Sequence, residues 1–164
     1  MASGEAHPGG GIGQRDRDRA ARLSVYFDTS ALVKLVLAED GSREAQRAWD
    51  SAETRVASVA LIAESRAAVA AARRAGRLDS RRYSIVVGDL TGLWEQIDGI
   101  VLTEELAVRA GELADGCALR GYDAIHLASA EAILDEGDVM IVSDTRLAEA
   151  AASIGIEALV PAGA

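Results

Sequence analysis

The chain is poor in the residues on which several protein classes depend. Its 164 residues include one cysteine and two histidines, too few for a disulfide framework or a zinc site built from Cys and His. Six aromatic residues disfavour domains that stack RNA bases on an aromatic platform. No apolar run approaches the ~18 residues of a membrane span, and the N-terminus lacks the apolar stretch of a secretory signal. We therefore expect a cytoplasmic protein with no membrane contact.

Positive charge is also scarce. Lys and Arg number 17 against 26 Asp and Glu, giving a net charge of −9, which excludes a uniformly basic nucleic-acid-binding protein. The one dense basic segment of the predicted fold is AARRAGRLDSRR, with Arg73, Arg74, Arg77, Arg81 and Arg82. This segment is either a solvated face, a contact for RNA phosphates, or a surface for an acidic stretch of a protein partner.

Residues 1–21 differ in composition from the rest of the chain. They combine clustered glycines with alternating Arg and Asp and show no apolar periodicity, which predicts a disordered tail. Residues 22–164 are 143 residues long, enough for a single hydrophobic core and too few for two ordinary domains.

From Leu23 onward, short apolar segments alternate with helical patterns, which is typical of an α/β domain with a mainly parallel sheet. The predicted strands lie at 23–27, 55–58, 100–102, 139–143 and, with a weaker pattern, 156–159. The predicted helices lie at 30–38, 42–52, 60–75, 79–97, 104–118, 123–136 and 145–153. The sequence thus predicts a short, mainly parallel sheet flanked by about seven helices.

One local pattern occurs twice: an apolar strand, then Asp-Thr, then a helix, in VYFDTSALVKL and in MIVSDTRLAEA. The acids are Asp28 and Asp144. The carboxyl ends of parallel strands line the crevice in which open α/β sheets bind ligands, so we expect both carboxylates in the same cleft. The alternative is a structural role, because Asp before a helix accepts a hydrogen bond from a free backbone N–H.

Two further acids lie in apolar surroundings. Glu64 lies within SVALIAESRAAVAAA and Asp123 within LRGYDAIHLASA. The alternatives are an ion pair between Glu64 and Arg66, and stabilisation of Asp123 by the dipole of the helix it begins. Two carboxylates about 4 Å apart repel by roughly 4 kcal/mol at an effective dielectric constant near 20. A cluster of all four acids would therefore require a cation, and oxygen ligands suit Mg²⁺ or Mn²⁺.

These segments together resemble the PIN domain, and most closely its VapC-like toxin ribonucleases from bacterial type II toxin–antitoxin pairs. YFDTSALVKL, RGYDAIHLASA and VSDTRLAEAA carry the resemblance, which covers about residues 23–160. It implies a PIN-like three-layer α/β fold and an endoribonuclease that depends on Mg²⁺ or Mn²⁺. The catalytic, metal-binding acids that it implies are Asp28, Glu64, Asp123 and Asp144.

The resemblance also implies supporting residues and partners. Thr29 and Ser30 match the small hydroxyl residues that orient a carboxylate or a metal-bound water. Members often carry a hydroxyl two residues before the last acid, where this chain has Val142 with Ser143 adjacent. The implied partners are RNA, an antitoxin whose tail lies beside the active site, and a second copy of the chain. The alternative is a catalytically weak PIN domain that binds RNA or protein.

His126 follows Asp123 by three residues and so lies on the same side of the predicted helix. A role beside the acids is geometrically open, but the apolar context DAIHLA favours a core histidine packed against the sheet with one ring nitrogen satisfied. Other enzyme classes that use an Asp-Thr-Ser motif fit less well. In aspartic proteases the motif lies in an all-β fold, and a HAD-type phosphatase requires an acid where this chain has Ser30.

Overall fold

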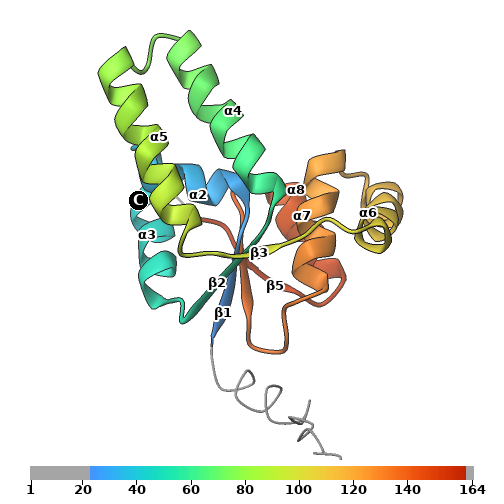
Figure 1. The fold of residues 1–164 in the computed structure, drawn as a ribbon. Helices are drawn as coiled ribbons and strands as arrows, with labels where there is room; N and C mark the ends of the chain where they lie inside the picture. Colours follow the sequence, from blue (N-terminus) through green and yellow to red (C-terminus); the bar gives the residue numbers. More distant parts are fainter. Residues whose placement is uncertain (1–22, 162–164) are drawn as a thin grey trace, which may run out of the picture.

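The computed structural model describes residues 23–161, which form one α/β domain (Figure 1). Its sheet has five strands in the order β3-β2-β1-β4-β5, and each neighbouring pair is parallel. The strands are β1 (Ser24–Phe27), β2 (Thr54–Ser58), β3 (Asp98–Ile100), β4 (Val139–Ile141) and β5 (Glu157–Leu159). The helices are α2 (Thr29–Val36), α3 (Ser42–Ser51), α4 (Ala60–Arg74), α5 (Ser80–Trp94), α6 (Glu104–Cys117), α7 (Gly121–Glu131) and α8 (Thr145–Ser153). The tail predicted at 1–21 lies outside the described residues.

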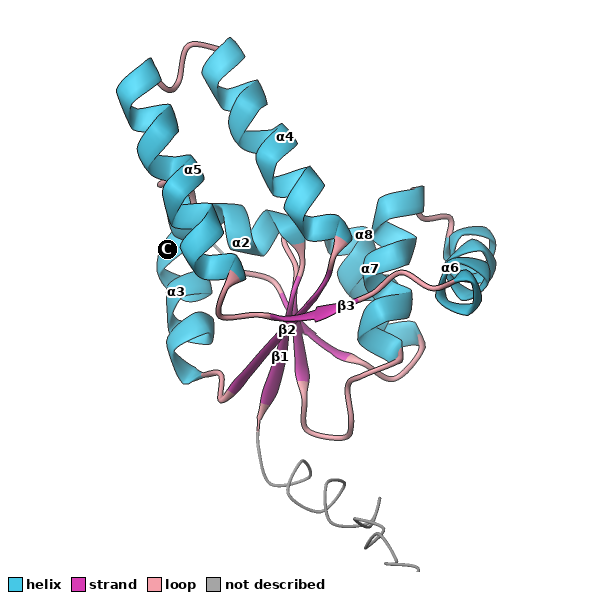
Figure 2. Cartoon of the chain, viewed as in Figure 1, coloured by secondary structure: helices cyan, strands magenta, loops and turns pink. Residues whose placement is uncertain are grey.

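The domain has three layers, because helices cover both faces of the sheet. Val25 and Phe27 on β1 point to a core shared with α2, α3, α4 and α5. Tyr26, between them, points to a second core shared with α6, α7 and α8. This alternation follows from the two-residue period of a strand. Figure 2 shows the two groups of helices on opposite sides of the sheet, which confirms the predicted fold class.

Several predicted elements differ from the structure at their ends, and two of these differences have a clear physical cause. Strand β3 lies at Asp98–Ile100 rather than 100–102, since it pairs with β2 through the exposed Asp98 and Gly99, which an apolar pattern does not reveal. Helix α7 begins at Gly121 and ends at Glu131 rather than extending to 136. Ile133 and Leu134 pack against the second core from the turn that follows α7, so their apolar character continues beyond the helix. In the described part of the chain, no helix is both long and apolar enough to cross a membrane.

The strand order determines where a ligand site forms. From the central β1 the chain passes to β2 and then β3 on one side, and later reaches β4 on the other side of β1. The connections therefore diverge between β1 and β4, and open α/β sheets bind ligands at the carboxyl ends of the strands at such a switch point. Asp28 directly follows β1, and its N–H donates to the carbonyl of Ile141, the last residue of β4 (3.1 Å).

Candidate active site

A cleft of about 430 Å³ opens at this edge of the sheet. Its walls come from α2, α4, the loops that follow β1 and β4, the first turn of α7, and the turn between α4 and α5. All four predicted acids line this cleft: Asp28, Glu64, Asp123 and Asp144. They come from four separate segments, so the fold brings together what the sequence keeps 20 or more residues apart.

Asp28 is both a helix cap and a cleft residue. Its Oδ2 accepts hydrogen bonds from the backbone N–H (3.2 Å) and the hydroxyl of Ser30, and so caps α2. Its other oxygen, Oδ1, lies 3.7 Å from Nε2 of His126. The residue is only 6% exposed. The capping and the ligand interpretations are therefore compatible, because each uses a different carboxylate oxygen.

Asp144, in the loop that follows β4, likewise caps a helix and lines the cleft. Its Oδ1 accepts from the backbone N–H groups of Arg146 (2.8 Å) and Leu147 (3.4 Å), which caps α8. Its side chain remains 41% exposed, at the mouth of the cleft. Its side chain is more exposed than the side chains of Asp28, at 9%, and Glu64, at 23%.

Asp123 lies in the first turn of α7 and is half-buried. Burial and the neighbouring negative charges of Asp28 and Asp144 raise the pKa of Asp123 above its ordinary value, against an opposing effect of Arg120. Burial is the larger cause, and the added effect of Asp28 and Asp144 is the repulsion expected among neighbouring carboxylates. A cation bound in the cleft would reduce this repulsion.

Glu64 on α4 is held by two donors. Its Oε2 accepts from the Thr29 hydroxyl (2.7 Å) and lies 2.6 Å from Nε2 of His126. Burial raises the pKa of a carboxyl group, but at Glu64 the hydrogen bonds with His126 and Thr29 outweigh it, and the pKa lies below its ordinary value. Glu64 is therefore ionised at neutral pH. Its partners are these residues and not Arg66, which lines a separate, apolar pocket beside Trp94.

Ser30 connects the two strand ends that carry acids. Its hydroxyl donates to Asp28 and accepts from the backbone N–H of Ser143 (3.0 Å). Val142 is fully buried in the second core and contributes no group to the cleft. Ser143 lines the cleft, and among residues 23–161 its buried hydroxyl oxygen is the one buried side-chain polar atom without a hydrogen-bond partner.

His126 lies closer to the acids than the sequence indicated. The prediction of a buried ring on the sheet is correct, since His126 is 1% exposed and its Nδ1 lies 2.8 Å from the Tyr26 hydroxyl on β1. The structure adds a second partner that the sequence did not indicate, because Nε2 is bonded to Glu64. Burial lowers the pKa of His126, but the bond to Glu64 and the charge of Asp28 outweigh it and raise the pKa above its usual value.

The contacts of His126 also exclude a nucleophile of the Ser-His-Asp kind at this position. Thr29 Oγ1 lies 3.2 Å from Nε2, but the Thr29 hydroxyl donates to Glu64. Because an ionised carboxylate only accepts hydrogen bonds, Nε2 must carry a hydrogen. It has no lone pair with which to deprotonate Thr29.

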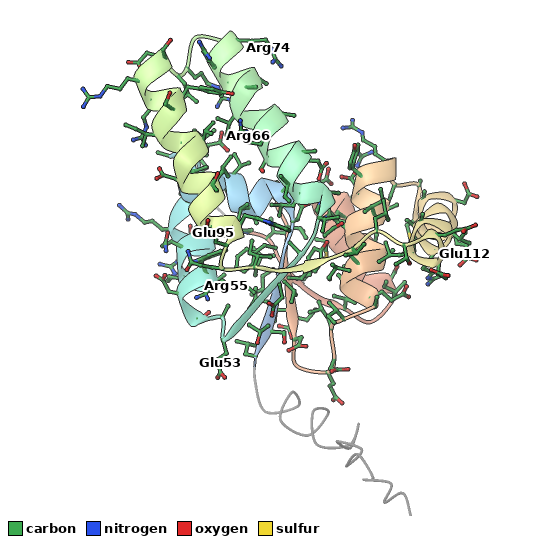
Figure 3. All side chains as sticks on the ribbon, in the orientation of Figure 1. Glu53, Arg55, Arg66, Arg74, Glu95 and Glu112 are labelled. Carbon is green, nitrogen blue, oxygen red and sulfur yellow. The ribbon has the colours of Figure 1, made fainter. Side chains whose placement is uncertain are left out.

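The five predicted arginines do not act as one cluster. Only Arg77, in the turn after α4, lines the cleft, where it forms an ion pair with Glu39 (3.1 Å). Arg73 stacks on Tyr83, with its guanidinium 4.7 Å from the ring centre. Arg74 lies at the outer end of the α4–α5 hairpin (Figure 3). Arg81 and Arg82 are exposed in the first turn of α5.

Lys34 also lines the cleft and forms its basic end together with Arg77, although the basic segment of the sequence did not include it. Lys34 is one helical turn beyond Ser30 on α2, about 6 Å along the helix axis, and its Nζ donates to the carbonyl of Asp40 (2.6 Å). The position four residues after Ser30, on the same helix face, is the one sequence signal that could have identified it. One cleft therefore has an acidic end and a basic end.

The donor set of the acidic end suits a hard cation. Across residues 23–161, no three side chains among His, Cys, Asp and Glu are grouped so that they could hold a metal ion by themselves. The cleft therefore differs from a closed structural zinc site, in which four side chains surround the metal. Mg²⁺ is commonly held by one or two carboxylates together with water and substrate phosphates. The carboxylate oxygens of the four acids, the raised pKa of Asp123 and the unpaired Ser143 hydroxyl fit that mode of binding.

Comparison with known proteins places these observations in a family. The model of the PIN domain family matches residues 25–153. Ribonuclease VapC45 of Mycobacterium tuberculosis is 41% identical over 131 residues, 80% of this chain and 91% of that protein. The crystal structure of VapC20 of M. tuberculosis, described as a sarcin–ricin loop cleaving toxin, superposes with a TM-score of 0.59 at 20% identity over 84% of this chain and 99% of that one. VapBC2 from Rickettsia felis, bound to a promoter DNA fragment, superposes with a TM-score of 0.58 at 13% identity over 84% and 98%.

Proposed function

Since the chain belongs to the PIN domain family and is 41% identical to a VapC ribonuclease over 131 residues, we propose that it is a VapC-type endoribonuclease that depends on Mg²⁺ or Mn²⁺. The observation that carries the proposal is the meeting of four acids, from four separate segments, in one cleft at the switch point of the sheet. In this proposal the protein is the toxin of a toxin–antitoxin pair and acts in the cytoplasm.

Asp28 and Asp123 are the proposed principal metal ligands, with Glu64 and Asp144 completing the site directly or through water. When bound, the metal supplies an activated water and offsets the negative charge that develops on the departing oxygen of an in-line displacement. The protein's own residues provide the geometry: Ser30 holds one oxygen of Asp28, and Thr29 holds one oxygen of Glu64. Ser143 is the proposed hydrogen-bonding partner for a water or for the substrate.

The basic end of the cleft is the proposed contact for RNA phosphates. The ion pair between Arg77 and Glu39 joins side chains that are 58% and 35% exposed, and such exposed pairs contribute little to stability. Arg77 can therefore exchange Glu39 for a phosphate at small cost. Lys34 and Arg77 would then hold the RNA strand beside the acidic end, which would otherwise repel it.

Replacing both Lys34 and Arg77 by Gln should raise the KM for RNA and flatten its dependence on salt concentration. Each lost phosphate contact lowers the magnitude of the slope of log K against log [salt] by about 0.7 for single strands. The kcat should change less than twofold, because neither residue lies among the acids. The measurement is steady-state cleavage of a single-stranded RNA at several salt concentrations.

The matched control for this experiment is the double replacement of Arg81 and Arg82 by Gln, which removes the same charge from the first turn of α5. These residues do not line the cleft, so KM and the salt slope should stay near their wild-type values. Equal effects of the two double replacements would contradict a phosphate contact at the cleft and favour a diffuse electrostatic effect of the hairpin.

The proposed protein partner is an antitoxin, with a homodimer as the proposed assembly of the toxin. Support comes from the VapC relatives described above and from the charge of the cleft, whose acids an Arg or Lys of a partner's tail would neutralise. Co-expression with the small protein encoded by the neighbouring gene should give a stable complex with suppressed nuclease activity. A fully active, uncomplexed toxin from that co-expression would contradict this part of the proposal.

The alternative is a PIN domain that binds RNA or protein with little catalysis. Titration with Mn²⁺ by calorimetry, together with an RNA cleavage assay, separates the two functions. The endoribonuclease should bind Mn²⁺ and cleave RNA only when the metal is present, whereas the binding module would retain RNA without cleaving it. The presence of all four acids in one cleft favours the enzyme.

A further inference from the structure

His126 is the most completely bonded polar side chain beside the cleft, although it does not itself line the cleft. It is 1% exposed and lies on α7, one turn after Asp123. Its ring joins three other elements: β1 through Tyr26, the start of α2 through Thr29, and α4 through Glu64. Any buried histidine needs a polar partner at each ring nitrogen, but here one of those partners, Glu64, lines the cleft.

The hydrogen bonds of this group have a defined direction. The backbone N–H of Ser58, the last residue of β2, donates to the Tyr26 hydroxyl oxygen (3.1 Å). In the neutral ring, Nε2–H donates to the Glu64 carboxylate at 2.6 Å, so Nδ1 is left as the acceptor. The Tyr26 hydroxyl, 2.8 Å from Nδ1, supplies the hydrogen that this acceptor needs. In the neutral ring, the Glu64 carboxylate and the Tyr26 hydroxyl together place the hydrogen on Nε2. The protonated ring, which the raised pKa of His126 favours, keeps the same Nε2–H donor.

The end of this chain of hydrogen bonds fixes one oxygen of Glu64. Oε2 is held by both Nε2–H of His126 and the Thr29 hydroxyl. Among residues 23–161, the other oxygen, Oε1, makes no hydrogen bond. A free glutamate side chain on a helix samples several rotamers, and holding it in one position costs conformational entropy. Because the fold already fixes both donors, the conformational entropy of Glu64 is lost during folding and not when a ligand binds.

We propose that His126 is a positioning residue, which holds Glu64 in the cleft through Nε2–H and is itself oriented by Tyr26. The inference rests on the proposed function, because it assigns Glu64 a part in the same metal site. His126 does not touch the RNA or the reacting atoms. Its role resembles that of outer hydrogen-bond partners at metal sites, whose removal commonly lowers metal affinity or activity by about 10- to 100-fold.

Two variants of His126 test the proposal. His126→Leu removes both ring nitrogens at similar volume, and should weaken Mn²⁺ binding by about tenfold or more in a calorimetric titration. It should lower kcat by a similar factor and leave the KM for RNA within about twofold. His126→Gln keeps an N–H donor near the position of Nε2 and should recover much of both losses. Tyr26→Phe, which releases the ring from its tautomer, should lie between wild type and His126→Leu.

The control for a purely structural effect is Leu127→Val, a neighbouring fully buried position on α7 whose side chain belongs to the second core. This change loosens the packing of α7 without touching Glu64, so it should lower the melting temperature and leave Mn²⁺ affinity unchanged. Equal losses of Mn²⁺ affinity in Leu127→Val and His126→Leu would overturn the proposal. Wild-type affinity and kcat in a folded His126→Leu protein would also overturn it.

A spectroscopic measurement tests the tautomer without metal or RNA. The chain has two histidines, His7 and His126, so the ring ¹⁵N signals of His126 can be assigned by their loss in His126→Gln. A protonated, slowly exchanging Nε2 is expected, and an Nε2 without hydrogen would contradict the proposal. The ¹⁵N signal and the Mn²⁺ affinity can both be measured without RNA. If the wild type showed a protonated Nε2 and bound Mn²⁺ but cleaved no RNA, the endoribonuclease proposal would be rejected and the positioning role would be retained. A wild type that binds no Mn²⁺ would reject the positioning role.

Discussion

Asp28→Asn and Asp123→Asn are each expected to lower the rate of metal-dependent RNA cleavage by about 100-fold or more. The physical reason is that a neutral amide is a poor ligand for a hard cation, and metal ions contribute several kcal/mol to stabilising the transition state of phosphodiester hydrolysis. A loss of about 2.7 kcal/mol corresponds to 100-fold in rate. The measurement is cleavage of a single-stranded RNA with Mg²⁺ or Mn²⁺, compared with the same reaction in chelator.

The matched control for Asp28→Asn is Asp79→Asn. Asp79 is also an Asp at a helix N-cap, where its side chain accepts from the N–H of Arg82 (2.7 Å) at the start of α5, but it does not line the cleft. Asn caps helices about as well as Asp, so both proteins should remain folded. Asp79→Asn should cleave at the wild-type rate. Wild-type cleavage by a folded Asp28→Asn protein would rule out Asp28 as a metal ligand.

Addition of Mn²⁺ or Mg²⁺ should raise the melting temperature of the wild type more than that of Asp123→Asn. A ligand that binds only the folded state stabilises it by about 2.7 kcal/mol at 100 times its dissociation constant. For a domain of this size that corresponds to a rise of roughly 5–10 °C. Asp123→Asn should gain much less, because the variant has lost a proposed ligand. Thermal unfolding with chelator and with added metal measures both shifts.

In chelator, where no metal is bound, Asp123→Asn should have a higher melting temperature than the wild type. The pKa of Asp123 is raised in the folded protein by burial and by the charges of Asp28 and Asp144. A carboxyl group with a raised folded-state pKa destabilises the protein once it is ionised. This cost is absent below the ordinary pKa of Asp, grows as the pH rises from there toward the folded-state pKa, and is complete above the folded-state pKa.

The difference in melting temperature between Asp123→Asn and the wild type should therefore shrink as the pH is lowered from 7 toward 4. Comparing the two proteins at each pH cancels the titration of groups that they share. If Asp123→Asn melted below the wild type in chelator, and metal shifted both proteins equally, the four acids would not be clustered around a cation site. The endoribonuclease proposal would then lose its physical basis.

The fold could be predicted in large part from local sequence patterns. The apolar segments LSVYF and VMIVS predicted the strands β1 and β4, each followed by an Asp that caps the next helix. Both features depend on neighbours in the chain: a strand on its apolar side chains, and a helix start on an Asp that accepts a nearby N–H. The helix limits at Thr145–Ser153 were predicted correctly for the same reason.

The composition of the cleft depended on contacts between residues far apart in the chain. Parallel pairing on both sides of β1 brings α4 and α7 to the same edge of the sheet, and with them Glu64 and Asp123. Sequence alone suggested these acids through their apolar surroundings and the family resemblance, but it gave no distances. It also could not separate Arg77 from its basic neighbours, because only the turn after α4 brings one of them to the cleft.

The sequence by itself determined which residues are carboxylates, the order and type of the strands and helices, and that four acids lie next to or within apolar segments. The tertiary structure decided which oxygen of Asp28 caps a helix and which lies near His126, and it decided that both nitrogens of His126 are bonded. The reason is that caps and periodicity arise within a few residues. The bonds of His126 reach Tyr26 and Glu64, which are 100 and 62 residues away, and only the packed sheet and helices bring those groups within hydrogen-bonding distance.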